Sequence, residues 1–115
     1  MSIENEIIEF SDFLRVDMRA GTVLSVKLNE KARVSAYILE IDFGSLGIKT
    51  TSAQITEAYK PEDIVGIQVI AVVNFPPKRV AGVKSEVLVL GIVQNDDPTI
   101  LLQPTQPVTN GSRVA

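Results

Sequence analysis

The stretch that decides the fold reads Gln68-Val69-Ile70-Ala71-Val72-Val73-Asn74-Phe75-Pro76-Pro77-Lys78-Arg79. Its first half is almost entirely apolar and largely β-branched, which is typical of a strand that is covered on both faces. Pro76 and Pro77 end this strand, because proline has no N–H to donate to a neighbouring strand. The stretch therefore predicts a buried strand that leads directly into an aromatic ring, a stiff diproline and two cations.

Further strands are predicted on both sides of this stretch. Alternation of apolar and polar residues begins at Met18 and continues through Leu28, and Gly21 indicates a bulge or a close backbone approach within it. Gly44 to Gly47 provides a hairpin connection with two residues that tolerate positive φ. The other predicted strands cover residues 37–43, 48–52, 86–93 and, as a short addition, 100–103.

Helices are predicted to be few and short. Residues 3–14 are expected to form a helical N-terminal segment, and Ser52 is placed to cap a helix over residues 53–59 that stops before Pro61. Pro61 can then open one further helical turn. Residues 80–85, which contain a glycine, are predicted to be a loop.

This order of elements predicts an all-β fold with short helices, namely a five-stranded Greek-key barrel of the OB type with short terminal additions. An SH3-like barrel is the main alternative, but it explains the helix before Pro61 less well. The length of 115 residues suits a single domain over residues 1–115, with an acidic helical segment at 1–14 and a C-terminal tail at 104–115.

Composition argues against most enzymes. The chain has no cysteine and no histidine, so it lacks a thiol nucleophile, the usual acid and base near neutral pH, and the commonest metal ligands. The carboxylates are scattered, and no phosphate-binding glycine loop follows a strand. We expect no enzyme activity, no cofactor and no metal. The N-terminus does not resemble a signal peptide and the apolar runs are too short to span a bilayer, so we expect a cytoplasmic protein without membrane insertion.

The charge is unevenly distributed. The net charge of the chain is −3, yet residues 1–17 alone sum to −4 and the remainder to +1. Within that remainder, Lys78, Arg79 and Lys84 lie close together with only Glu86 opposing them. A local positive patch can attract phosphate even on an acidic protein. The alternative is that these are ordinary solubilising charges.

Several residues are candidates for ligand contact. Phe75 offers a stacking or peptide-binding surface, although its position at a strand end favours an interpretation as a core residue. Lys31 and Arg33 fall in the turn between the first two strands, which often borders the ligand face of an OB fold. Ser52 and Gln54 either donate to a ligand or belong to a helix cap.

At this point the sequence resembles the tRNA-binding domain family, most closely its stand-alone branch of CsaA-type secretion chaperones. The resemblance extends over roughly residues 10–112. It is carried by Arg19-Ala-Gly-Thr-Val23, Ser52-Ala-Gln-Ile-Thr-Glu-Ala-Tyr59, Lys60-Pro61-Glu62, residues 69–77 and Gly82-Val-Lys-Ser-Glu-Val-Leu-Val-Leu-Gly91.

The resemblance implies an OB-fold core, a homodimer built through the terminal segments, and no catalysis. By matching position it implies an RNA-facing rim, to which the first turn adds its two cations: Lys31, Arg33, Ser52, Gln54, Asn74, Lys78, Arg79, Lys84, Ser85 and Glu86. A peptide-binding surface would comprise Phe75, Pro76, Pro77, Val80 and Val83.

The favoured function is a CsaA-like chaperone that binds unfolded polypeptides or preproteins for export and also binds tRNA, with the export motor as a further partner. Two alternatives stay open. One is a protein that chiefly binds tRNA by its shape, and the other is a docking subunit for a synthetase or the export machinery.

Overall fold

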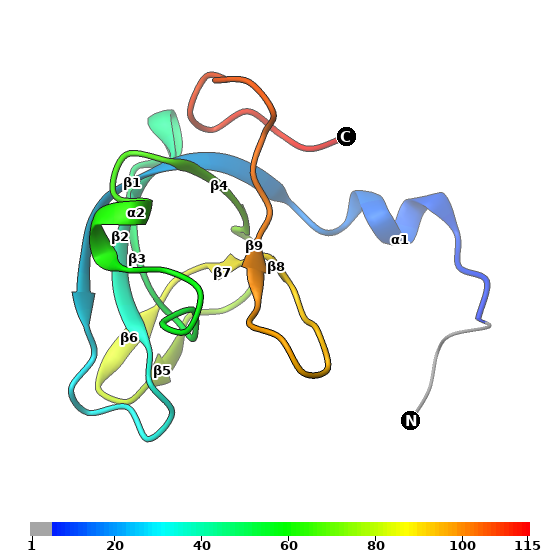
Figure 1. The fold of residues 1–115 in the computed structure, drawn as a ribbon. Helices are drawn as coiled ribbons and strands as arrows, with labels where there is room; N and C mark the ends of the chain where they lie inside the picture. Colours follow the sequence, from blue (N-terminus) through cyan, green and yellow to red (C-terminus); the bar gives the residue numbers. More distant parts are fainter. Residues whose placement is uncertain (1–5) are drawn as a thin grey trace.

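The computed structural model describes residues 6–115, and its centre is a five-stranded antiparallel sheet. The strand order is β3-β2-β1-β4-β7. These strands are β1 (Met18–Leu28), β2 (Tyr37–Asp42), β3 (Ile48–Ala53), β4 (Gln68–Val72) and β7 (Leu88–Val89). The sheet curls on itself, so that the chain around β7 returns to β3 and nearly closes a barrel (Figure 1). The predicted OB-like barrel is therefore confirmed.

Hydrogen bonds between the β3 side and residues 85–87 close the barrel. Glu86 N donates to Thr50 O at 2.9 Å, and Thr50 N donates to the Glu86 carboxylate at 3.0 Å. The buried Thr51 hydroxyl donates to Val87 O at 2.7 Å. We call this closure the seam (residues 50–52 and 85–87).

The core consists of inward-facing residues from the strands. Leu39, Ile41, Phe43 and Val69 are fully buried. Gly21 lies against this core, and a Cβ there would come within 2.7 Å of the Ile41 and Phe43 side chains, which confirms the predicted close approach. The neighbouring helix α2 (Pro61–Ile64) begins at a proline as predicted and adds its buried Ile64 to the core.

Two segments differ from the prediction through tertiary contacts. The helix over residues 53–59 is absent, because β3 continues to Ala53 and the Tyr37 hydroxyl bonds Tyr59 O at 2.8 Å in the turn that follows. The single strand over 86–93 is broken at Leu90, after which β8 (Gly91–Ile92) leaves the main sheet to pair with β9 (Ile100–Leu101).

Residues 80–85 are also not a simple loop. They belong to a hairpin of β5 (Lys78–Val80) and β6 (Val83–Ser85), in which Lys78 pairs with Ser85. The turn consists of Ala81 and Gly82, whose φ values are +48° and +81°. Two positive φ values give the turn that matches the twist of a hairpin, but alanine is not a residue that signals it.

The N-terminal segment contains less helix than the sequence predicts. Helix α1 (Phe10–Leu14) projects away from the barrel (Figure 1), and residues 6–9 before it are not helical. The predicted helical segment is thus shorter than expected, and its residues 1–5 lie outside the described part of the chain.

A short 3-10 turn, η1 (Gly44–Leu46), occupies the predicted hairpin connection. Among residues 6–115, no helix is long and apolar enough to cross a membrane.

The C-terminal segment packs along β1. Val114 N donates to Met18 O at 2.9 Å, Ala20 N to Ser112 O at 3.0 Å, and Gly111 N to Ala20 O at 2.8 Å. Gln68 and Asn110 add side-chain bonds to this contact, including Gln68 Nε2 to Asn110 Oδ1 at 2.9 Å. We call residues 108–114 together with their contacts on β1 and β4 the clasp.

Candidate nucleic-acid interface

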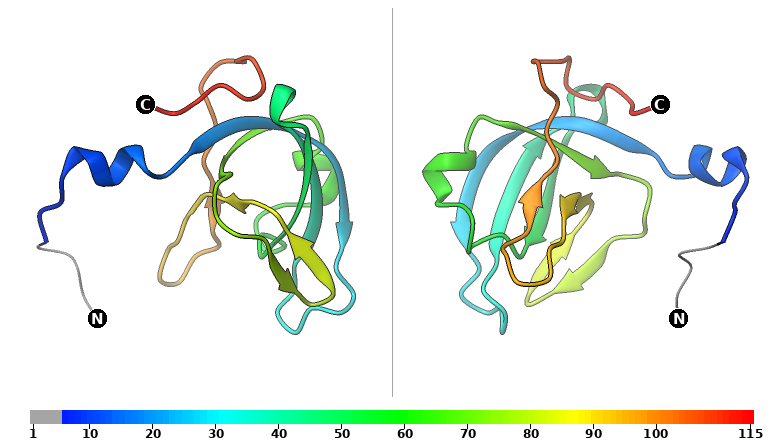
Figure 2. Two further views of the ribbon diagram at one scale, coloured as in Figure 1. Left: turned by 180° about the vertical axis from the view of Figure 1, so that it is seen from behind. Right: turned by 45° about the vertical axis from the view of Figure 1, so that its right-hand side comes forward.

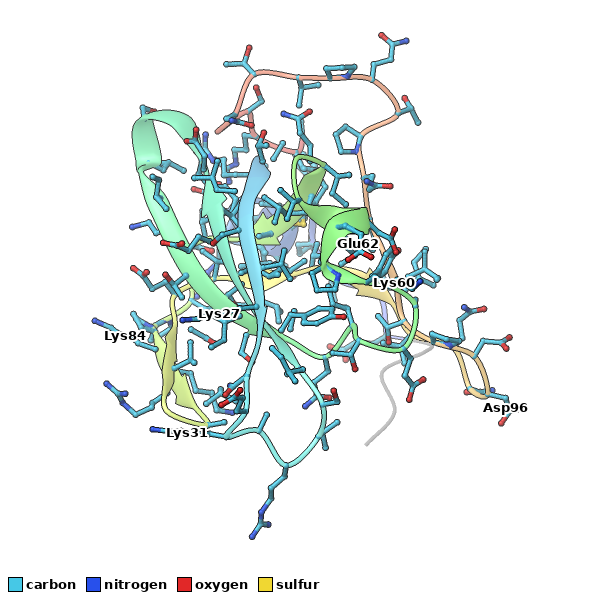
Figure 3. All side chains as sticks on the ribbon, turned by 60° about the vertical axis from the view of Figure 1, so that its left-hand side comes forward. Lys27, Lys31, Lys60, Glu62, Lys84 and Asp96 are labelled. Carbon is cyan, nitrogen blue, oxygen red and sulfur yellow. The ribbon has the colours of Figure 1, made fainter. Side chains whose placement is uncertain are left out.

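Six cations gather where the loop between β1 and β2 meets the β5–β6 hairpin. The two segments lie side by side at one end of the barrel in every view (Figures 1 and 2). Figure 3 shows Lys27, Lys31 and Lys84 extending outward from this end, while Lys60, Glu62 and Asp96 lie elsewhere on the molecule. We call this surface the basic end; it comprises Lys27, Lys31, Arg33, Lys78, Arg79 and Lys84, all of them exposed.

No cation of the basic end forms an ion pair within residues 6–115. The ion pairs of this part of the chain join Asp17 to Arg19 and to Arg113, which belong to the region of the clasp. Glu30 and Glu86 are the acidic residues closest in sequence, and the Glu86 carboxylate is occupied by Thr50 N in the seam. The basic end therefore carries positive charge that is available to an anionic ligand.

Two grooves give the basic end its shape. One, of about 620 Å³, lies between residues 27–31, at the end of β1 and the start of the loop that follows, and residues 81–83 of the hairpin. The other, of about 400 Å³, also borders Lys31 and Ala81 and brings Arg33 together with Ser52 and Gln54. Backbone phosphates and sugars that follow such grooves would meet lysine and arginine side chains, which is how proteins hold the RNA backbone.

Three of the predicted RNA contacts already have partners inside the protein. Ser85 Oγ accepts from Ser52 N at 3.0 Å, and the Glu86 carboxylate accepts from Thr50 N, so both side chains support the seam. Asn74 donates to Arg15 O at 2.8 Å and accepts from Asp17 N at 2.9 Å. The structure thus gives these three side chains a structural role, and their contact with RNA stays a prediction.

A third groove, of about 310 Å³, lies beside the basic end and is mainly apolar. Phe75, Pro76 and Val80 line it together with Val87 and Leu88. Phe75 is 48% exposed, so the interpretation of this ring as a core residue is wrong. The other two residues of the predicted peptide surface lie elsewhere, since Pro77 does not line this groove and Val83 lines the 620 Å³ groove.

The prediction from sequence missed two polar centres. One is Asn29, which is buried within the first loop. The other is Asp17, which accepts from Arg19 Nε at 2.6 Å and lies 3.6 Å from Arg113 Nε. The hydrogen bond from Arg19 lowers the pKa of Asp17 and raises that of Arg19. A polar residue at a strand end would have been the signal for Asn29, while Arg113 is distant in sequence and gives no such signal. Residues 6–115 hold no cluster of potential metal ligands.

Comparison with known proteins gives consistent matches over nearly the whole chain. A family model described as "Putative tRNA binding domain" matches residues 18–113. The crystal structure of the chaperone CsaA from Bacillus anthracis str. Ames is 55% identical with a TM-score of 0.90, covering 95% of this chain and 99% of that one. The CsaA chaperone protein of Picrophilus torridus is 42% identical with a TM-score of 0.88, covering 95% of this chain and 100% of that one.

A second kind of relative is much longer. The methionine–tRNA ligase of Bacteroides fragilis is 37% identical over 107 residues, which is 93% of this chain. This chain spans only 16% of the length of that ligase. The match therefore concerns one part of the enzyme.

Proposed function

Because this chain belongs to the tRNA-binding domain family, we propose that it is a non-catalytic protein that binds tRNA through the basic end. The observation that carries this proposal is the gathering of six exposed cations that have no ion partner among residues 6–115. Phosphate neutralisation by such groups releases counterions and supplies affinity without reading the base sequence. The grooves between the two loops would then favour a folded RNA through its shape.

A salt titration of tRNA binding tests this proposal. We expect the affinity of the purified protein for tRNA to fall steeply between low and moderate salt. The double variant Lys78→Ala with Arg79→Ala should bind tRNA more weakly, and the slope of log Kd against log salt should fall by about two, one for each lost phosphate contact. The matched control is Lys49→Ala with Lys60→Ala, which removes the same charge outside the basic end. Affinity that is unchanged by salt, or equal loss in both double variants, would contradict the proposal.

A specific observation favours a second activity, the binding of unfolded polypeptides. The 310 Å³ groove presents the half-exposed Phe75 ring beside apolar Val87 and Leu88. The chain also covers 99% of a protein named as a chaperone at 55% identity. We propose that flexible, apolar segments of preproteins occupy this groove. Since the contact is mainly apolar, binding of a fluorescent unfolded peptide should change little over the salt range that weakens tRNA binding.

A homodimer is the third part of the proposal. Ile7 is 96% exposed, Phe10 71% and Val93 83%. Helix α1 and the loop that joins β8 to β9 project on the same side of the barrel, away from the basic end (Figure 1). Two copies related by a two-fold axis would cover these apolar residues reciprocally. Sedimentation should show a dimer for the wild type and a monomer for Phe10→Ser with Val93→Ser, and a monomeric wild type would exclude it.

The cellular partners follow from the same proposal. A cytoplasmic protein that binds preproteins would meet them before export, in contact with the export motor. Isolation of the protein from cytosol with its bound material, followed by identification of RNA and peptides in the same sample, tests these partners together. Recovery of a synthetase, with neither RNA nor peptides, would favour the role of a docking subunit instead.

A further inference from the structure

The turn of the β5–β6 hairpin is strained. Ala81 has φ +48° and is the only residue besides glycine with positive φ in the described part of the chain. For an L residue with a Cβ this conformation is sterically disfavoured. Such a residue persists only where its surroundings fix it, and strain of this kind often occurs at functional sites.

Three side chains from two segments converge on this turn. Arg79 Nη1 donates to Gly82 O at 3.2 Å, from within the hairpin. Asn29 Nδ2 makes a long hydrogen bond of 3.5 Å to Ala81 O from the first loop. The Lys31 side chain covers Gly82, since a Cβ on this glycine would lie 3.2 Å from Lys31 Cδ and 3.7 Å from Lys31 Nζ. Two cations of the basic end are therefore packed against one turn.

Asn29 connects the two segments. Its side-chain oxygen accepts from Lys31 N at 3.1 Å, while its side-chain nitrogen reaches Ala81 O. Its backbone N–H also donates to Ala36 O at 2.9 Å, across the base of the first loop. The residue is only 5% exposed, so these polar groups have no ready access to water. One buried amide thus holds the backbone of Lys31 and contacts the turn of the hairpin that carries Arg79 and Lys84.

We infer that Asn29 is a positioning residue for RNA binding, which holds the cations of the first loop and of the hairpin at a fixed spacing. This inference rests on the proposed binding of tRNA to the basic end. Lys31 and Arg79 repel each other while no anion is bound, and without the tie the first loop is free to move away from the hairpin. Holding them together beforehand avoids the ordering cost that binding would otherwise include.

The test uses Asn29→Ser in the full chain. A serine hydroxyl can still accept from Lys31 N, as in common turns, but it is too short to reach Ala81 O, and the net charge is unchanged. We expect the Kd for tRNA to rise about fivefold at moderate salt, which is the cost of immobilising about one or two side chains on binding that are already fixed in the wild type. The slope of log Kd against log salt should also fall by about one ion contact.

The matched control is Asn110→Ser at the opposite end of the barrel. Asn110 Oδ1 accepts from the Thr22 hydroxyl at 2.7 Å and from Gln68 Nε2 at 2.9 Å, so this variant also removes bonds of a partly buried amide. Both variants should have a lower Tm, but Asn110→Ser should keep the wild-type Kd and salt slope. Gly82→Ala is the second variant of the turn: alanine is disfavoured at φ +81° and its Cβ would lie 3.2 Å from Lys31 Cδ, so the variant disturbs both the turn and the packing of Lys31 without changing any charge.

The outcomes separate the inference from the proposal on which it rests. A wild-type protein that does not bind tRNA, or binds it without dependence on salt, contradicts the proposed function and takes the inference with it. A wild-type protein that binds as proposed, with folded Asn29→Ser or Gly82→Ala equal to it in Kd and slope, overturns the inference alone. If Asn29→Ser does not fold, Gly82→Ala by itself decides between these results.

Discussion

The clasp and the basic end lie at opposite ends of the barrel and use charge in opposite ways. Near the clasp, Asp17 lies between Arg19 and Arg113, and Arg113 also donates to Leu14 O at 2.8 Å. Arg19 in turn donates to Gly111 O at 2.9 Å. At the basic end, none of the six cations has an ion partner within residues 6–115.

This difference indicates which charges serve folding and which are kept for a ligand. Paired charges with backbone hydrogen bonds hold the C-terminal segment, β1 and the chain before it together. Unpaired like charges around one turn repel each other and bring no stability to the isolated protein. The comparison therefore predicts that substitutions at the clasp act on stability, whereas substitutions at the basic end act on binding.

Charge reversal should give the largest effect and test the comparison most directly. Arg79→Glu with Lys84→Glu should raise the Kd for tRNA by roughly 100-fold or more, because two attractive contacts become repulsive. The Tm should change by no more than a few degrees, because relief of the repulsion among the cations offsets the lost hydrogen bond from Arg79 to Gly82 O. Filter binding or fluorescence anisotropy, together with a thermal melt, measures both quantities.

The matched reversal near the clasp is Arg15→Glu with Arg113→Glu, which changes the net charge by the same amount. This variant should lose Tm, because Asp17 loses the partner at 3.6 Å and gains a repulsive neighbour. Its folded fraction should bind tRNA within about threefold of the wild type. A similar loss of affinity in both double variants would mean that net charge matters and the position of the cations does not.

The next largest effect concerns the backbone of the clasp. Gly111→Ala combines φ +89° with a Cβ that would lie 2.5 Å from Phe43 O, so we expect the free energy of unfolding to fall by about 2–3 kcal/mol. Gly66→Ala is the control, since Gly66 has nearly the same φ of +90° but no neighbour within 4 Å of a Cβ. It should lose only about 1 kcal/mol. Equal losses in chemical denaturation would show that the close packing of the clasp contributes nothing.

The sequence predicts the barrel well because the main strands form by local alternation. Residues 18–28, 37–42 and 68–72 carry the apolar patterns of strands, Pro61 opens α2, and Pro76 follows the end of β4 because proline has no N–H to donate. The helix over 53–59 was predicted wrongly because its local preference is overridden by the bond from the Tyr37 hydroxyl to Tyr59 O. The hairpin at 78–85 was missed because its turn uses Ala81 at a positive φ that alanine rarely adopts.

The candidate site was predictable in its residue types but not in its spatial order. The cations of two loops are visible in the sequence, yet their meeting depends on Asn29, which bonds across 52 positions of the chain. The clasp depends in the same way on Arg113 and Asn110, which bond to residues 99 and 88 positions earlier. Such contacts follow from closure of the barrel, and no local sequence pattern predicts them.

A smaller effect is expected at the apolar groove beside the basic end. Phe75→Ala should weaken binding of an unfolded peptide about tenfold, because a half-exposed ring is lost from the groove. It should lower the Tm by no more than a few degrees, since the ring is not part of the core. Phe43→Ala serves as the contrast, because its buried ring should lower stability strongly. A large drop in Tm for Phe75→Ala, with unchanged peptide binding by the folded fraction, would contradict the assignment of the groove.

The smallest effect is the pH dependence of the stability that Asp17 contributes near the clasp. The hydrogen bond from Arg19 lowers the pKa of Asp17 below its ordinary value of 3.8. A carboxylate whose pKa is lowered by folding stabilises the protein at pH values above its pKa in the unfolded chain. This contribution disappears as the pH falls through its pKa in the folded protein. At pH 6, Asp17→Asn should therefore melt about 3 °C below the wild type, a size typical of an ion pair at a partly exposed position. The gap should shrink steadily below about pH 4, because the wild-type carboxylate is then protonated as well.

The control is Asp96→Asn, in the exposed loop between β8 and β9, which removes the same charge and should have the same Tm as the wild type at pH 6. If the gap for Asp17→Asn persists unchanged at pH 2.5, the clasp is held by its neutral hydrogen bonds, and the contrast between paired and unpaired ends no longer rests on charge.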